Sequence, residues 1–134
     1  MSERMFERQI THNAVSSNGW SNPKLCRDAR HIVVVLSTNG LSLGHRATFK
    51  VAHSFAETAP DFTSASSSSN PWQYVQTYNL EDGKPIDGSD GIAFITNDDV
   101  VMLEINQNLA NWVAIQVSDL DAGTASSMII LATS

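Results

Sequence analysis

The feature that most constrains the fold is a regular alternation of apolar and polar residues along several stretches of the chain. Every second residue from Ala47 to Phe55 is apolar or His, with Thr48 and Lys50 on the opposite side. The same spacing recurs over 101–105 and 113–117. A period of two is that of a strand with one buried face. We therefore predict half-buried β-strands in these segments.

Other segments have the composition of strands. The Val-rich run from His31 to Thr38 is predicted to be a central strand covered on both faces. Trp72, Tyr74 and Tyr78 are expected to line one face of a further strand. The set of about eight strands is completed by candidates near 9–15, 92–96 and 128–133.

Turn signals separate these strands. Asn-Gly and Asp-Gly pairs favour the positive φ angles of tight hairpins, and they occur at 18–19, 39–40, 82–83, 87–88 and 90–91. We therefore predict an all-β fold, a single antiparallel β-sandwich of jelly-roll type with about eight strands. A competing helix over 97–117 is disfavoured by the many β-branched residues of that segment.

Strand parity also predicts which residues form the core, and composition predicts which segments lie outside it. The expected core residues are Val33, Val35, Phe49, Val51, Val101, Leu103, Ile115, Val117 and Ile130. The Ser-rich segment 59–71 is predicted to be a long exposed loop rather than a linker. Residues 1–134 are thus expected to form one domain, with residues 1–8 as a candidate N-terminal arm.

Charge is unevenly distributed along the 134 residues, whose formal charge is −6. Residues 1–50 have a net charge of +4 and residues 51–134 of −10. The excess of acid disfavours direct binding of nucleic acid, which requires clustered Lys and Arg. The asymmetry could make one end of a molecule complementary to its neighbour or to a larger partner, or it could be lost when the fold mixes both segments.

Several features bear on where the protein is made. A lone Cys26 cannot form an intramolecular disulfide. The opening residues mix charges without an apolar region, so we expect synthesis in the cytoplasm without export. No apolar run approaches the ~20 residues of a membrane span, so no membrane partner is expected.

Motifs that carry chemistry are not apparent. There is no Gly-x-Ser-x-Gly elbow, and the glycines at 40 and 44 lack the Lys of a phosphate-binding loop. His45 and His53 are about 26 Å apart on an extended strand at ~3.3 Å per residue, too far to bind one metal ion. We therefore expect no enzymatic activity, metal or cofactor. The aromatic residues Trp72, Tyr74 and Tyr78 leave a carbohydrate-binding module as the alternative function.

Three segments carry a family resemblance. They are Ala47-Thr-Phe-Lys-Val-Ala-His-Ser-Phe55, Trp72-Gln-Tyr-Val75 and the run from Asn111 to Ala132, which contains Trp-Val-Ala-Ile-Gln-Val and Ala-Gly-Thr. Together they resemble the small β-sandwich proteins of tailed bacteriophage particles: auxiliary, decoration, or minor head and tail proteins. The resemblance covers roughly residues 45–134.

This resemblance implies a non-enzymatic structural protein located in the virion. The implied partners are capsid or tail proteins of the same particle, and a homo-oligomer is expected. The basic N-terminal part provides the candidate interface, with Arg4, Phe6 and Arg8 as its residues.

Overall fold

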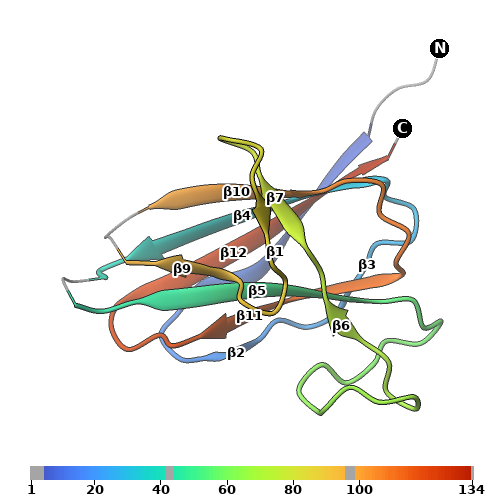
Figure 1. The fold of residues 1–134 in the computed structure, drawn as a ribbon, viewed down its shortest axis with the longest axis horizontal. Coiled ribbons are helices and arrows are strands. Elements are labelled where there is room, and N and C mark those ends of the chain that lie inside the picture. The colour runs from blue at the N-terminus through green and yellow to red at the C-terminus, as the bar shows by residue number, and fades with distance from the viewer. Residues whose placement is uncertain (1–4, 42–43, 96–98, 134) are drawn as a thin grey trace.

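A computed structural model describes residues 5–41, 44–95 and 99–133. Within those ranges the chain forms two antiparallel sheets that pack face to face as a β-sandwich (Figure 1). We call them sheet A and sheet B. The predicted all-β sandwich is therefore confirmed. The described strands number twelve rather than about eight, because several strands of only two residues were not visible as alternation.

Sheet A contains the long strands of the two chain ends. Its order is β1 (Met5–Val15), β12 (Thr124–Thr133), β4 (His31–Asn39), β10 (Val100–Ile105), β7 (Thr77–Asn79) and β8 (Pro85–Ile86). Sheet B has the order β2 (Gly19–Trp20), β11 (Trp112–Ser118), β5 (Ala47–Ser54) and β6 (Gln73–Tyr74), with β3 (Lys24–Leu25) pairing to β11 and β9 (Ile92–Phe94) pairing to β5. The segment 97–117, where a helix is disfavoured by the sequence, forms β10 and most of β11 over its described part.

The core lies between the two sheets. Of the predicted core residues, five are buried: Phe49, Val51, Leu103, Ile115 and Val117. The β11–β12 turn that closes the core contains Gly123 with φ +71°, and a Cβ there would lie 2.4 Å from the Asn39 carbonyl oxygen. This close approach requires glycine.

The prediction that β4 is covered on both faces is wrong, and so is the face assigned to the end of β12. Ile32, Val34 and Leu36 are buried, whereas Val33 and Val35 face outward and are half-buried. Ile130 is likewise half-buried beside Val33. The predicted core residue Val101 is also only half-buried, at the edge of the core. Continuous apolar runs hide strand parity, so only the pairing of distant strands settles which side faces the core.

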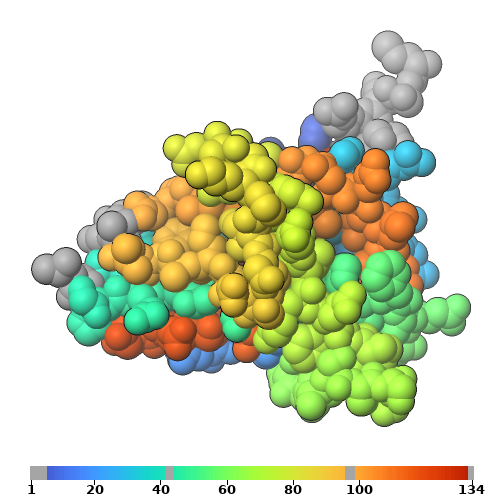
Figure 2. Space-filling model, in the orientation of Figure 1, coloured from blue at the N-terminus to red at the C-terminus, as the bar shows by residue number. Residues whose placement is uncertain are grey.

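The Ser-rich segment 59–71 is an exposed loop with internal order, and in Figure 2 it projects as a green lobe below β6. Asn70 closes it, because its Oδ1 accepts from the Asp61 amide at 2.8 Å and its Nδ2 donates to the Asp61 carbonyl at 2.8 Å. Phe62 anchors the loop, since its ring is buried against Trp20 and Trp72.

Candidate functional site

The candidate site is the outer face of sheet A, which strand register makes apolar. One row across the sheet consists of Ile10, Met128, Val35 and Met102, on β1, β12, β4 and β10 in turn. The next row consists of Arg8, Ile130, Val33 and Glu104 on the same four strands. These eight residues, with Phe6 and Val100, are what we call the outer face of sheet A.

Several of these apolar side chains are well exposed. Ile10 is 63% exposed, Val100 62% and Met102 48%. The outer face of an antiparallel sheet is usually polar where it meets water. A contiguous exposed apolar patch instead marks a site of interaction.

A β-bulge determines which residues of β1 reach this face. The register shifts between Ile10 and His12, so these two residues lie on opposite sides of the sheet although they are two apart. His12 is buried, with its Nδ1 2.6 Å from the Ser127 hydroxyl and its Nε2 3.3 Å from the Gly19 carbonyl. Burial lowers the pKa of His12, while the hydrogen bond to Gly19 opposes the shift.

Two opposite charges flank the apolar rows. Arg8 lies on the edge strand β1, and no described residue forms an ion pair with it. Glu104 lies three strands away on β10, where His31 Nδ1 is 3.9 Å from its carboxylate. The charges are in the same row but are separated by about 14 Å at the ~4.8 Å spacing of strands, too far for a direct contact.

The face is also hollowed. A depression of about 210 Å³ is bordered by Ile10, Val35 and Met128, with Ser37 and Ser126 at one end. His12, Asn13 and Ser127 complete its lining, so apolar side chains border one part of the depression and polar side chains the other.

The outer face of sheet B is organised differently, because the chain covers it. Trp20, Tyr74 and Trp112 pack there with Trp72 and with Phe62 of the loop 59–71. The Tyr74 hydroxyl donates to Gln116 at 2.9 Å, and Lys50 Nζ lies 5.2 Å from the centre of the Tyr74 ring. Partial burial raises the pKa of Tyr74. The loop therefore covers the apolar outer face of sheet B with side chains of the same chain.

The aromatic residues predicted as a sugar platform do not share one surface. Trp72 and Tyr74 meet edge to face, with ring centres 5.2 Å apart, and Trp72 Nε1 donates to the Ser64 carbonyl at 3.0 Å. Tyr78 lies in the other sheet, where it pairs with Glu104, because the chain crosses between sheets after β6. Tyr74 and Tyr78 therefore lie on two short strands, β6 and β7, and Trp72 directly precedes β6.

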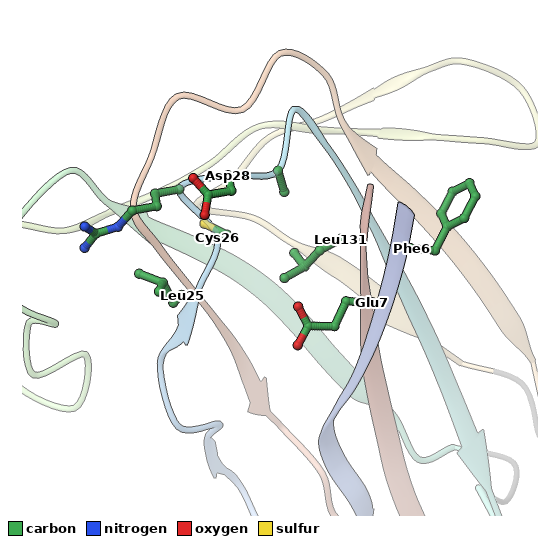
Figure 3. Close-up of a pocket in the computed structure, with 8 residues that line it drawn as sticks. Phe6, Glu7, Leu25, Cys26, Asp28 and Leu131 are labelled. Atoms are coloured by element: carbon green, nitrogen blue, oxygen red, sulfur yellow. The ribbon is translucent and has the colours of Figure 1, made fainter. Parts of the chain in front are cut away.

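A second cavity, of about 330 Å³, opens beside β1 and the segment after β3. Figure 3 shows Glu7 directed toward Leu131 and Leu25, and Phe6 directed away from them. Cys26 borders this cavity, but burial raises the pKa of its thiol to about 11. The thiol is therefore protonated near neutral pH and is a poor nucleophile there.

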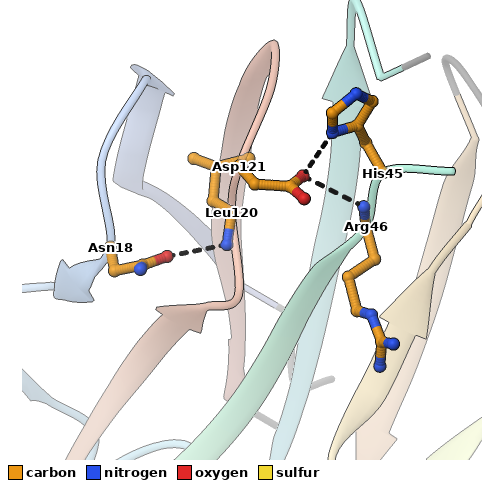
Figure 4. A network of polar contacts seen from close by, with 5 residues as sticks. All are labelled: Asn18, His45, Arg46, Leu120 and Asp121. Carbon is orange, nitrogen blue, oxygen red and sulfur yellow. Dashed lines mark hydrogen bonds and ion pairs between the residues drawn. The ribbon is translucent and has the colours of Figure 1, made fainter.

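A polar network fixes the β11–β12 turn (Figure 4). The Asp121 carboxylate lies 3.1 Å from His45 Nδ1 and accepts from the Arg46 amide at 3.3 Å, while Asn18 Oδ1 accepts from the Leu120 amide at 2.8 Å. Desolvation opposes ionisation of Asp121, but these contacts lower its pKa overall. In the part of the chain that the structure describes, no three His, Cys, Asp or Glu side chains gather as a metal site.

The predicted interface residues lie partly on the candidate site. Phe6 and Arg8 are in β1, where they pair with Ala132 and Ile130, and so belong to the outer face of sheet A. The expected arm 1–8 is thus strand from residue 5 onward. Arg4 lies outside the described residues. Sequence reasoning missed Met128 on this face because it assigned Ile130, on the same side of β12, to the core. It left Met102 on the outer side of β10, but it assigned the neighbouring Val33 and Val35 to the core.

Comparison with known proteins relates the fold to prophage-derived proteins. The structure of SPBc2 prophage-derived protein YomS superposes with a TM-score of 0.69, covering 99% of this chain and 97% of YomS at 12% identity. The PBSX exported protein XepA also gives a TM-score of 0.69, covering 99% of this chain and 39% of XepA at 10% identity. At such identities the likeness is one of fold.

No family model and no curated protein match this sequence. Among the described residues, no helix has the length and apolar character needed to span a membrane. The fold shared with YomS and XepA supports the phage-protein resemblance found in the sequence, at the level of fold.

Proposed function

We propose that the chain is a non-enzymatic structural protein of a phage particle and acts through protein–protein contacts with capsid or tail components. The observation that carries this proposal is the exposed apolar outer face of sheet A, with Ile10, Met102 and Val100 exposed to solvent. A face of this type loses unfavourable hydration when another protein covers it.

The fold supports the phage context. YomS and XepA, which share the fold over 99% of this chain, are described as prophage-derived and PBSX proteins. Phe6 and Arg8, the residues expected at an interface, lie on the same face. The proposal assigns the protein to the virion after synthesis in the host cytoplasm.

Particle occupancy tests the proposal. A tagged chain is expressed during growth of the phage or prophage that encodes it, and particles are purified on a density gradient. The chain should sediment with the particles at a fixed number of copies, measured by quantitative mass spectrometry. Recovery of the chain only in particle-free fractions would overturn the proposal.

A pair of matched variants tests the face. Met102→Glu places a charge on the outer face of sheet A, whereas Leu109→Glu changes an exposed residue of the β10–β11 loop, which is 81% exposed. Met102→Glu should lower the particle-bound fraction at least roughly tenfold, because burying an unpaired charge is costly. Leu109→Glu should leave the fraction unchanged. Circular dichroism should show that both variants keep the fold.

A further inference from the structure

We propose that the outer face of sheet A binds a second copy of this chain, in a dimer whose twofold axis lies between the two faces and runs nearly along the strands, between β12 and β4. This inference deepens the proposed structural role, since it names one partner of the same face. It rests on strand register, on the positions of two charges and on the hollow in the face.

The register makes the apolar rows self-complementary. The first four strands of sheet A follow the order β1, β12, β4 and β10. An axis between the middle two strands places β1 over β10 of the second copy and β12 over β4 of the second copy. Ile10 then lies opposite Met102 of the second copy, and Met128 opposite Val35. In the adjacent row Ile130 lies opposite Val33.

The same twofold rotation pairs the charges of Arg8 and Glu104. Arg8 and Glu104 occupy the first and fourth positions of one row, so each lies opposite the other in the second copy. The dimer therefore contains this pair twice. Facing sheets are about 10 Å apart, a gap that the long Arg and Glu side chains span together. Within one chain Arg8 and Glu104 are too far apart to meet. A direct contact between these two residues therefore requires a second copy of the chain.

The hollow fits the same arrangement. It is bordered by Ile10, Val35 and Met128, at the part of the face that β10 of the second copy would approach. Met102 and Val100 are exposed on β10 and supply apolar side chains to fill it. On sheet B the chain's own Phe62 and Trp72 cover the outer face, whereas the face of sheet A lacks such a cover among the described residues.

The area is adequate for a weak dimer. Four strands at ~4.8 Å and four outward-facing rows at ~6.6 Å span roughly 19 by 26 Å, on the order of 500 Å² per copy in projection. Stable interfaces bury about 800 Å² per partner. We therefore expect a dissociation constant in the micromolar range, which sedimentation equilibrium measures directly.

Charge reversal gives the decisive test. The purified full chain, of 14.6 kDa, should sediment with twice that mass at about 100 µM. Arg8→Glu alone and Glu104→Arg alone each create two like-charge contacts across the axis, so each should raise the dissociation constant at least roughly tenfold. The double variant Arg8→Glu/Glu104→Arg should restore dimerisation. An equimolar mixture of the two single variants should also dimerise, because both contacts in the mixed dimer are attractive.

The outcomes separate this inference from the proposed function. A monomeric wild-type chain, an assembly of another size, or single variants that dimerise as well as wild type would each overturn the proposed interface. Leu109→Glu serves as the control and should dimerise normally. Particle occupancy is measured independently, so a monomeric chain that still sediments with particles would refute the dimer and leave the proposed function standing.

Discussion

At the scale of single residues, Asn108 joins two loops through a buried side chain. Its Nδ2 donates to the carbonyl oxygens of Cys26 and Ala29, both at 3.0 Å, and its Oδ1 accepts from the Ala110 amide at 3.1 Å. The backbone amide of Asn108 also donates to the Arg30 carbonyl at 2.7 Å. The loop before β4 is therefore fixed to the loop between β10 and β11.

Replacing Asn108 by Ala should lower the free energy of unfolding by roughly 2–4 kcal/mol, because buried backbone groups lose their partners. Urea unfolding monitored by circular dichroism measures the change. Asn106→Ala alters an exposed residue of the same loop and should be nearly neutral. A loss below about 1 kcal/mol for Asn108→Ala would contradict this role for the amide.

At the scale of elements, the loop 59–71 acts as a cover for sheet B. Besides the closure by Asn70, Asp61 accepts hydrogen bonds from the Thr63 amide at 2.9 Å and from the Ser64 hydroxyl at 2.9 Å. Within the loop, the Ser67 and Ser69 hydroxyls are also 3.2 Å apart. The bulk of its apolar anchoring comes from Phe62, which is 3% exposed.

Phe62→Ala should therefore open the loop without unfolding the sandwich. Removing the ring leaves a cavity beside Trp20 and Trp72, at a cost of roughly 3 kcal/mol. Limited proteolysis should cut within residues 59–71 faster than in the wild type, and tryptophan fluorescence should shift to the red. Ser68→Ala, at an exposed position, should change neither signal. Equal cleavage rates for Phe62→Ala and wild type would show that the ring does not anchor the loop.

At the scale of the whole molecule, stability should fall in two steps as pH is lowered. Burial lowers the pKa of His12 and His53 from 6.5. Below pH 6.5 the unfolded chain binds more protons at these sites than the folded chain does, so acid favours unfolding. Hydrogen bonds from Thr63 and Ser64 lower the pKa of Asp61, and those from Ser89 and Asp90 lower that of Asp87. Protonation of these carboxyls below pH 3.8 removes further stability.

Thermal unfolding between pH 3 and 8 measures both steps. His12→Gln should flatten the pH dependence just below pH 6.5, because its side chain is not protonated there. Asp61→Asn should reduce only the loss below pH 3.8. If His12→Gln retained the full slope just below pH 6.5, the buried imidazole would not be its source.

The sequence by itself determined the class of fold and the positions of strands such as β5 and β11. Alternation over 47–55 and 113–117 requires one buried face, and Phe49, Val51, Ile115 and Val117 lie on it. Turn chemistry is equally local, as at Gly83, which has a φ of +72° in the turn predicted at 82–83. These features could be predicted because each depends on neighbours in the chain.

Only the tertiary structure decided which side of β4 faces the core, where Tyr78 lies and what the outer face of sheet A presents. The pairing of Ile32 with Leu131 joins residues far apart in sequence, and it turns Val33 outward. The β-bulge after Ile10 similarly separates Ile10 from His12. Where both faces of a strand are apolar, the local sequence does not show which side faces the core. The candidate site therefore forms only when distant strands pair in one particular register.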